Sequence, residues 1–337
     1  MAILKVDTIS GIGTEGPVFE GDIEFTSQNF LTLPKGDTTQ RGRGRGIISR
    51  GIPNTKTIQF LTIQSMGNAI DFGDLIFGGS GGFGFASSTR GIHGGGEFPS
   101  FTNVMDFVTI STQSNATDFG DITRGATGNS PGGASSQTRG LIFGGYTAPT
   151  RQNVIDFVTI ATTGNTQDFG FINNPTDGLG ACSSPTRALC AGGNITPSGN
   201  TNIIDFVTIA TTGNASDFGD LTEAKTLGGM ASNATRAIYL AGYQGSSRLT
   251  TIEFITIASK GDAVDFGVTY LDDIFGNNGG MTNETRLVSA GGFTPSATNL
   301  IMFVTINTTG TRNDFGDLFQ AVGYQSSFSD SHGGLAE

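Results

Sequence analysis

The sequence predicts an all-β protein, a six-bladed β-propeller with four-stranded blades. Three observations support this fold class. A unit of 47 to 50 residues recurs six times, each unit contains four strand-sized pieces, and the 337-residue chain holds 53 glycines. A repeat of this length with four strands is typical of a propeller blade. The repeat therefore outweighs chain length, which alone would suggest two domains.

The most regular part of each repeat is a hairpin, exemplified by residues 153–170, NVIDFVTIATTGNTQDFG. Residues 154–160 are β-branched and aromatic and predict a strand. Residues 162–165 predict a tight turn, because Gly and Asn tolerate positive φ. The Asp-Phe-Gly of residues 168–170 then opens the returning strand. Two Phe residues lie 12 positions apart in every copy. The repeats are centred on Phe60, Phe107, Phe157, Phe206, Phe254 and Phe303, and their partners are Phe72, Phe119, Phe169, Phe218, Phe266 and Phe315.

The first half of the repeat supplies two more strands. Residues 132–136 are small, and residues 141–145 form a strand that ends in Gly-Gly. Small side chains suit the innermost strand of a blade, because these strands crowd around the central channel. The repeats begin at residues 45–48 with a second-strand piece, whereas residues 325–335 align with a first-strand piece. We therefore expect the C-terminal strand to close the first blade and remove its free edge.

An Arg begins the second strand of every repeat, directly after the turn between strands one and two. In an up-and-down blade this turn lies on the same face as the turn between strands three and four. Each Arg could therefore approach an Asp of an Asp-Phe-Gly segment, and we predict a ring of Arg–Asp contacts that ties the turns together. The Arg residues are Arg45, Arg90, Arg139, Arg187, Arg236 and Arg286, and the Asp residues are Asp71, Asp118, Asp168, Asp217, Asp265 and Asp314. Exposed pairs of this kind stabilise a protein by only about 0–1 kcal/mol each.

The N-terminal part lies outside the repeats. Residues 1–36 contain short strand-like segments and predict an extended, β-rich arm that packs either on the propeller flank or on another subunit. Residues 37–44 are a polar linker, and residues 45–337 form the predicted propeller. The Arg-Gly run at 41–45 resembles an RNA-binding tract. However, the net charge of −11 argues against nucleic acid and anionic membranes as partners. A flexible linker or a basic patch that docks on an acidic neighbour are the alternatives.

The candidate chemical sites are few. Cys182 and Cys190 flank a predicted turn, and two free thiols are favoured over a disulfide. Six Asp-Phe-Gly copies do not indicate a kinase, which has one such segment among other motifs. Calcium binding at Asp118 and Asp121, or at the equivalent pairs, is a weaker alternative to a structural turn, because calcium loops need more oxygens. We expect no catalytic residue, no metal and no cofactor.

Length variation between repeats points to a binding surface. The hairpin between strands three and four never changes length, whereas insertions fall between strands two and three and between successive repeats. Both variable sets emerge on one face, which is the usual arrangement of a scaffold that holds recognition loops. Neutral drift in solvent-exposed loops is the alternative. The candidate loop residues are Phe98, Phe101, Tyr146, Arg151, Tyr243, Arg248 and Phe293.

Two resemblances follow from these motifs. The order of a small-residue strand, a strand ending in Gly-Gly and two strands with aromatics resembles the kelch repeat, with Phe in place of the Tyr and Trp of that pattern. The arm segments ILKVDTISG (3–11) and GPVFEGDIEFTSQNFLTLPKG (16–36), with the iterated IDFVTIATTGN…DFGDLT, resemble structural proteins of marine tailed phages, notably cyanobacterial ones.

The phage resemblance implies a non-enzymatic virion protein, a tail-fibre or appendage subunit. Its arm would contact other tail or capsid proteins, its loops would contact a host-surface glycan or protein, and it would be made in the host cytoplasm before joining the virion. A structural adaptor or decoration protein packed between virion proteins is one alternative. A glycan-active propeller enzyme is another.

Overall fold

The structure is a computed structural model that describes residues 44–97, 99–125, 127–128, 130–197, 199–269, 280–293 and 296–335. The chain divides into two units, Met1–Arg41 and Gly42–Glu337. The predicted arm (1–36), most of the predicted linker and the candidate loop residue Phe98 lie outside the described residues.

The second unit is all-β, which confirms the predicted class and the four-stranded antiparallel sheets. The described residues form six such sheets, named here sheets 1 to 6. Sheet 1 contains β29 (Ser326–Ser329), β1 (Arg45–Ser49), β2 (Thr57–Thr62) and β3 (Ile70–Asp74). Sheet 2 contains β4 (Phe83–Ala86), β5 (Arg90–Gly94), β6 (Val104–Thr109) and β7 (Thr117–Asp121). Sheet 3 contains β8 (Gly132–Ser135), β9 (Arg139–Phe143), β12 (Val154–Thr159) and β13 (Gln167–Phe171).

Sheets 4 to 6 repeat this order. Sheet 4 contains β15 (Gly180–Ser183), β16 (Arg187–Ala191), β19 (Ile203–Thr208) and β20 (Ser216–Asp220). Sheet 5 contains β21 (Gly229–Ser232), β22 (Arg236–Gln244), β23 (Ser247–Thr256) and β24 (Val264–Val268). Sheet 6 contains β25 (Met281–Thr282), β26 (Arg286–Ala290), β27 (Thr298–Thr305) and β28 (Asn313–Val322). Short loop strands are β10 (Tyr146–Thr147), β11 (Thr150–Arg151), β14 (Thr176–Asp177), β17 (Asn194–Ile195) and β18 (Gly199–Asn200).

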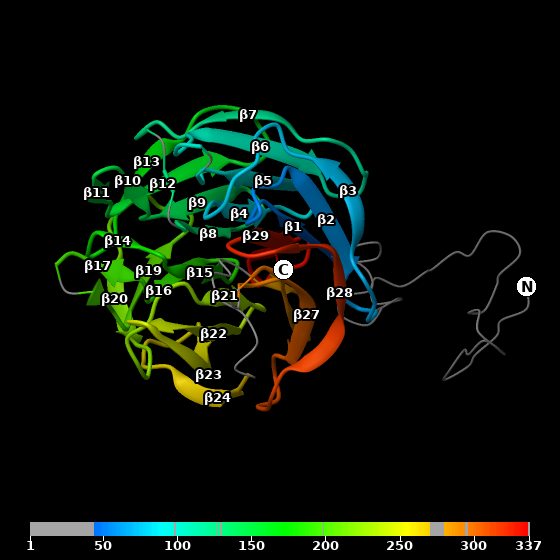
Figure 1. Cartoon of the computed structure of the whole chain (residues 1–337). Helices are drawn as coiled ribbons and strands as arrows, with labels where there is room; N and C mark the ends of the chain where they lie inside the picture. Colours follow the sequence, from blue (N-terminus) through cyan, green and yellow to red (C-terminus); the bar gives the residue numbers. More distant parts are fainter. Residues whose placement is uncertain are drawn as a thin grey trace, which may run out of the picture. The chain divides into compact units, whose positions relative to one another are not determined.

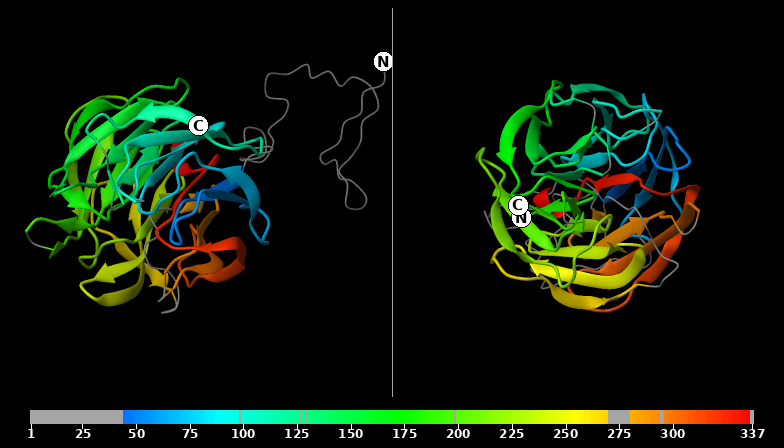
Figure 2. Two further views of the ribbon diagram at one scale, coloured as in Figure 1. Left: turned by 45° about the horizontal axis from the view of Figure 1, so that its top comes forward. Right: turned by 60° about the vertical axis from the view of Figure 1, so that its left-hand side comes forward.

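The sheets follow one another around the C-terminal segment (Figure 1). β4 contacts β29 and β8, β15 contacts β8 and β21, and β25 contacts β21 and β29. The series of first-strand contacts therefore runs from sheet 1 to sheet 6 and returns to sheet 1. The two turned views in Figure 2 show the same succession of sheets along the chain.

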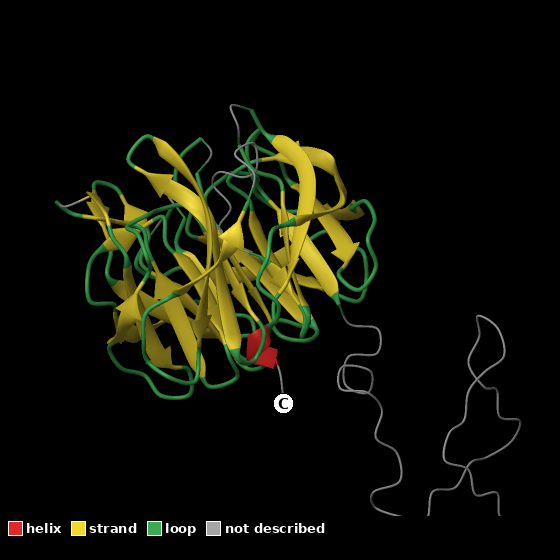
Figure 3. Ribbon diagram, turned by 90° about the horizontal axis from the view of Figure 1, so that it is seen from below, coloured by secondary structure: helices red, strands yellow, loops and turns green. Residues whose placement is uncertain are grey.

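The C-terminal strand completes the first sheet, as predicted. β29 pairs antiparallel with β1, with Ile47 opposite Phe328. The carboxylate of Asp330 then accepts hydrogen bonds from the N–H groups of Gly44 and Arg45, at 2.6 and 3.0 Å. The 3-10 helix η1 (Gly333–Leu335) follows at one end of the sheets (Figure 3). Residues at the two ends of the described chain are thus held together.

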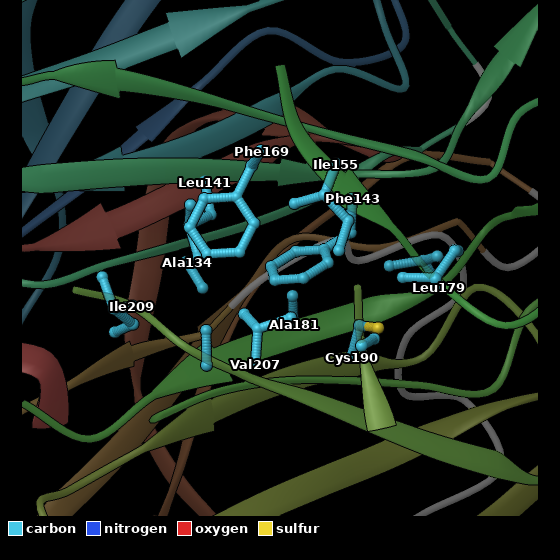
Figure 4. Packing of buried hydrophobic residues seen from close by; sticks show 13 residues of the cluster. Ala134, Leu141, Phe143, Ile155, Phe169, Leu179, Ala181, Cys190, Val207 and Ile209 are labelled. Carbon is cyan, nitrogen blue, oxygen red and sulfur yellow. The ribbon is translucent and has the colours of Figure 1, made fainter. Parts of the chain in front are cut away.

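The hydrophobic core lies between successive sheets. Six clusters of buried side chains fill the spaces between sheets 1 and 2, 2 and 3, 3 and 4, 4 and 5, 5 and 6, and 6 and 1. Figure 4 shows one of them, in which Phe169, Leu141 and Phe143 of sheet 3 face residues of sheet 4 such as Val207. Each sheet is therefore stabilised mainly by burying its two faces against its neighbours.

The two recurrent Phe residues form a T-shaped pair in every sheet. Their ring centroids are 5.7 to 6.4 Å apart, with interplanar angles of 73 to 82°. The Phe of Asp-Phe-Gly is the more deeply buried partner, and Phe169 is only 3% exposed. This geometry is the favourable edge-to-face arrangement of aromatic rings.

The predicted Arg–Asp ring is wrong, because each Arg binds a carbonyl of the following sheet. Arg139 Nη1 donates a 2.8 Å hydrogen bond to the carbonyl of Ile209, and its guanidinium lies 4.5 Å from the ring centre of Phe157. The other five Arg residues donate equivalent bonds of 2.8 to 3.1 Å. Asp168 is exposed instead. The carbonyl just beyond the end of a third strand has no partner in the hydrogen-bond ladder of its sheet. It is therefore a better-placed acceptor for the guanidinium than an exposed carboxylate.

Candidate functional site

The two ends of the sheets differ. The turn face comprises the turns between strands one and two and between strands three and four, residues 136–138 and 160–166 in sheet 3. The loop face comprises the segments between strands two and three and between successive sheets, residues 144–153 and 172–179 around sheet 3. Backbone hydrogen bonds join the latter two segments, including one from the N–H of Gly145 to the carbonyl of Thr176. The prediction that all variable loops share one face is therefore confirmed for these segments.

A cavity of about 390 Å³ opens on the loop face. Its volume falls within the range of about 300–1,000 Å³ that is usual for small-molecule sites. It is lined by Ile52, Ser80, Gly81, Glu97, Ser130, Arg151, Asp177, Gly178, Asn194, Leu227 and Tyr324. These residues come from loops that connect or interrupt several different sheets, so the folded chain assembles the site from distant parts of the sequence.

Equivalent residues just before the first strands line the inner wall of the cavity in an unusual backbone conformation. Gly81, Ser130, Gly178, Leu227 and Tyr324 have φ values of +67, +60, +65, +58 and +56°. The backbone groups of these residues are hydrogen-bonded to one another. The N–H of Ser130 donates to the carbonyl of Gly81, that of Leu227 to the carbonyl of Gly178, and that of Gly81 to the carbonyl of Tyr324, at 2.7 to 2.9 Å. Left-handed conformations cost roughly 1–3 kcal/mol for residues other than Gly, and such strain concentrates at functional sites.

An ion pair forms one side of the cavity. Arg151 Nε lies 2.9 Å from Asp177 Oδ1, and Arg151 Nη1 donates a 2.8 Å hydrogen bond to Thr196 Oγ1. Asp177 is buried, whereas Glu97 is exposed at the mouth. The charged lining therefore consists of one paired cation, its partner carboxylate and one accessible carboxylate.

An aromatic residue, Tyr324, also lines the cavity. The half-exposed ring of Tyr324 packs at 5.8 Å from Phe293, and burial is the main cause that raises the pKa of the Tyr324 hydroxyl. Tyr243, from the loop of sheet 5, is a nearby group that raises it further. The lining of the cavity thus combines polar groups with an aromatic residue.

Of the predicted loop residues that the structure describes, Arg151 alone is among the residues that line the cavity. Phe101 packs against Tyr146 at 5.7 Å, so both support neighbouring loops. Tyr243 pairs with Arg248 across the extended hairpin of β22 and β23, and Phe293 supports Tyr324. Sequence reasoning missed Tyr324, Asp177 and Asn194. Each of them lies next to a glycine, and this adjacency was the available signal.

At the turn face, the space between the first strands is narrow. Hydroxyls on successive first strands donate to the preceding strand's carbonyl at 2.7 to 2.8 Å. This hydroxyl series consists of Ser135, Ser183, Ser232, Thr282 and Ser329. His332 Nε2 lies 2.8 Å from the carbonyl of Ala86 and 3.2 Å from Ser135 Oγ. The cavity between these strands measures only about 40 Å³, which leaves room for water but not for a larger ligand.

A Ser–His–Asp grouping also occurs between sheets 1 and 2. Ser49 Oγ lies 2.5 Å from His93 Nδ1, and His93 pairs across the sheet with Asp106, whose carboxylate lies 3.9 Å from Arg50 Nη2. Arg50, His93 and Asp106 are fully buried, and desolvation lowers the pKa of His93 well below its usual value. Since no substrate could reach these groups, their place is in the core.

Other candidate chemistry is equally limited. Cys182 and Cys190 are free and buried, as favoured by the sequence, and burial raises the pKa of Cys182 to about 12. Among the described residues, no group of three or more His, Cys, Asp or Glu side chains is placed to hold a metal ion. No helix in the described part of the chain has the length and apolarity required to cross a membrane. Comparison with models of known protein families and with curated proteins finds no match.

Proposed function

We propose that the six sheets are the blades of a six-bladed, kelch-like β-propeller whose first blade is closed by β29. We further propose that the chain is a non-enzymatic component of a tailed-phage virion, a tail-fibre or appendage subunit. In this proposal residues 1–36 anchor it to other virion proteins, and the loop face contacts the host surface. The succession of sheets and the core clusters between them support the fold. The phage-like arm and repeat motifs support the virion setting.

The observation that carries the binding role is the difference between the two faces. The turn face consists of one recurring turn with recurring contacts and a cavity of about 40 Å³. The loop face holds a cavity of about 390 Å³ lined by side chains that differ from sheet to sheet. A regular scaffold that presents varied, concave loops is the usual arrangement of a recognition surface.

Host binding and particle incorporation can be tested separately. The full chain, labelled with a fluorophore, should adsorb to host cells, and loop-face substitutions should reduce this adsorption more than turn-face substitutions. Deletion of residues 1–36 should abolish incorporation into particles while the β-sheet circular dichroism persists. Unchanged virion content of the deletion variant would contradict the anchor, and release of sugars from host envelopes would favour the enzymatic alternative.

One observation favours the adaptor alternative. Large apolar side chains are exposed on the outer strands and their links, including Phe319 at 68%, Phe77 at 50% and Phe171 at 43%. Contact with a neighbouring virion protein would remove this apolar surface from water, which is favourable. If the adaptor role is correct, Phe77→Ser and Phe319→Ser should reduce particle incorporation without affecting adsorption to cells.

A further inference from the structure

We propose that the loop-face cavity binds a neutral saccharide. This inference rests on the proposed binding function and specifies the chemical class of its ligand. It combines three properties of the cavity: the state of its charged groups, its supply of hydrogen-bonding groups and its aromatic wall.

The charged groups disfavour an anionic ligand. Arg151 is the cationic side chain of the lining, and Asp177 and Thr196 already occupy its guanidinium at 2.9 and 2.8 Å. Glu97 presents a carboxylate at the mouth. A phosphate or carboxylate ligand would therefore meet the like charges of Glu97 and Asp177, and the charge of Arg151 is already offset by Asp177.

The polar groups suit hydroxyls. The exposed Glu97 can accept hydrogen bonds, and the partly exposed Asn194 amide and Ser80 hydroxyl can donate and accept them. A sugar hydroxyl likewise donates one bond and accepts others, so adjacent hydroxyls can match such a mixed lining without a net charge. A small number of well-positioned polar groups in a cavity is sufficient to orient a small ligand.

The aromatic wall supplies the apolar contact. Tyr324 lines the cavity, and its ring is supported from behind by Phe293 at 5.8 Å. The φ of +56° fixes the position of its backbone. A sugar ring has an apolar C–H face that can pack against such a ring while its hydroxyls reach the polar wall. The cavity of about 390 Å³ therefore suits a mono- or disaccharide unit.

The test uses the full chain and saturation-transfer NMR with methyl glycosides of galactose, glucose, mannose and N-acetylglucosamine. Inorganic phosphate and choline serve as anionic and cationic probes. Tyr324→Gly removes the ring at a position whose φ suits glycine, and Glu97→Gln removes the accessible carboxylate. Glu284→Gln, on the turn face, makes the same change of charge away from the cavity.

At least one neutral glycoside should bind, and each cavity variant should weaken binding by about tenfold or more. Glu284→Gln should bind as the unaltered chain does. The proposal is overturned if no glycoside gives saturation transfer, if phosphate or choline competes for the same site more strongly than any glycoside, or if Tyr324→Gly binds the glycoside normally.

The same variants separate this inference from the proposed function. If the chain adsorbs to host cells, and neither the glycosides nor Tyr324→Gly reduces adsorption, the saccharide inference fails while host binding stands. If the unaltered chain does not adsorb to host cells, host binding itself fails, whatever the glycosides do.

Discussion

The Arg at the start of each second strand joins two sheets through one planar group. Arg139 makes a hydrogen bond to the carbonyl of Ile209 in sheet 4 and covers Phe157 in its own sheet. A bond between a charged donor and a neutral acceptor stabilises a fold by about 1.5–3 kcal/mol. Stacking on an aromatic ring adds to this.

Replacing Arg139 should therefore destabilise the fold where replacing Asp168 should not. We expect Arg139→Met to lower the free energy of unfolding by about 1.5–3 kcal/mol in urea denaturation. Asp168→Asn, at an exposed position, should change it by less than about 0.5 kcal/mol. Equal losses in the two variants would restore the Arg–Asp interpretation.

The buried Phe of the Asp-Phe-Gly segment belongs to the core between two sheets. Phe169 is 3% exposed and packs among residues of sheets 3 and 4. Phe169→Ala should lower the free energy of unfolding by about 3–5 kcal/mol, because it removes buried apolar surface and leaves a cavity. Phe171→Ala, two residues along the same strand but 43% exposed, is the matched control for thermal unfolding.

His332 gives the fold a dependence on pH. Burial lowers the pKa of His332 from 6.5 to about 4, although its hydrogen bond with the carbonyl of Ala86 opposes the shift. The unfolded chain takes up this proton at a higher pH than the folded chain does. The contribution of His332 to the free energy of unfolding is therefore fully present above pH 6.5. It is lost as the pH falls from 6.5 towards 4, and the loss amounts to about 3 kcal/mol.

The His332→Gln variant should lose less stability than the unaltered chain when denaturation is compared at neutral pH and at about pH 4.5. His93 contributes with the same sign, because its pKa is also lowered. The raised pKa values of Asp106 and Asp156 act in the opposite direction. An identical pH profile for the variant would show that His332 does not titrate in this window.

The sequence predicted which residues recur but not all of their partners. The recurrence of residues between repeats identified the Phe pairs and the Arg series. It could not show that the Arg guanidinium binds a main-chain carbonyl in preference to a carboxylate. It also passed over the acid that precedes four of the six strand Phe residues, Asp106, Asp156, Asp205 and Glu253. Asp205 accepts a 3.0 Å bond from the N–H of Asn173, in the link from the preceding sheet. A polar residue at a strand position that should be buried was the available signal.

At the scale of elements, the hairpin between strands three and four is fixed by its neighbour. The N–H of Gly164 donates to the carbonyl of Phe119 in sheet 2 at 2.7 Å, and Asn165 Oδ1 accepts from the N–H of Asp121 at 3.0 Å. Equivalent Gly and Asn contacts recur around the sheets. A Cβ on Gly170 would lie 2.4 Å from the carbonyl oxygen of Gly213. The hairpin length is therefore constant because the turn contacts the neighbouring sheet as well as its own sheet.

An insertion in this hairpin should be costly. One Gly inserted between Thr163 and Gly164 should remove both contacts to sheet 2 and lower the free energy of unfolding by about 1–3 kcal/mol. The same insertion between Gly245 and Ser246, in the exposed loop of sheet 5, should have an effect below about 0.5 kcal/mol. Similar unfolding midpoints in urea for the two variants would contradict the assignment.

At the scale of the molecule, local patterns predicted the sheets but not the cavity. Sheets 2 to 6 are each encoded within fewer than about fifty residues, so turn and strand signals suffice for them. The loop-face cavity combines Glu97, Arg151, Asn194 and Tyr324, which lie far apart in the sequence. Their convergence depends on how successive sheets are placed around one another, which no single repeat specifies.

Removing the last strand should affect the whole molecule. Truncation after Gly323 would leave β1 without β29 and expose Ile47 and Ile48, which are now fully buried. We expect loss of the cooperative thermal transition and aggregation through the free edge. Truncation after Leu335 is the control and should melt as the full chain does.

The pairing of β29 with β1 also sets an order of events during synthesis. Gly44 and Asp330, which are bonded in the folded chain, lie 286 positions apart. On the ribosome, sheets 2 to 6 have all their strands while sheet 1 still lacks its inner strand. The nascent chain must therefore keep one open edge until β29 has been added, and a chaperone or a partner subunit would have its longest opportunity to act there.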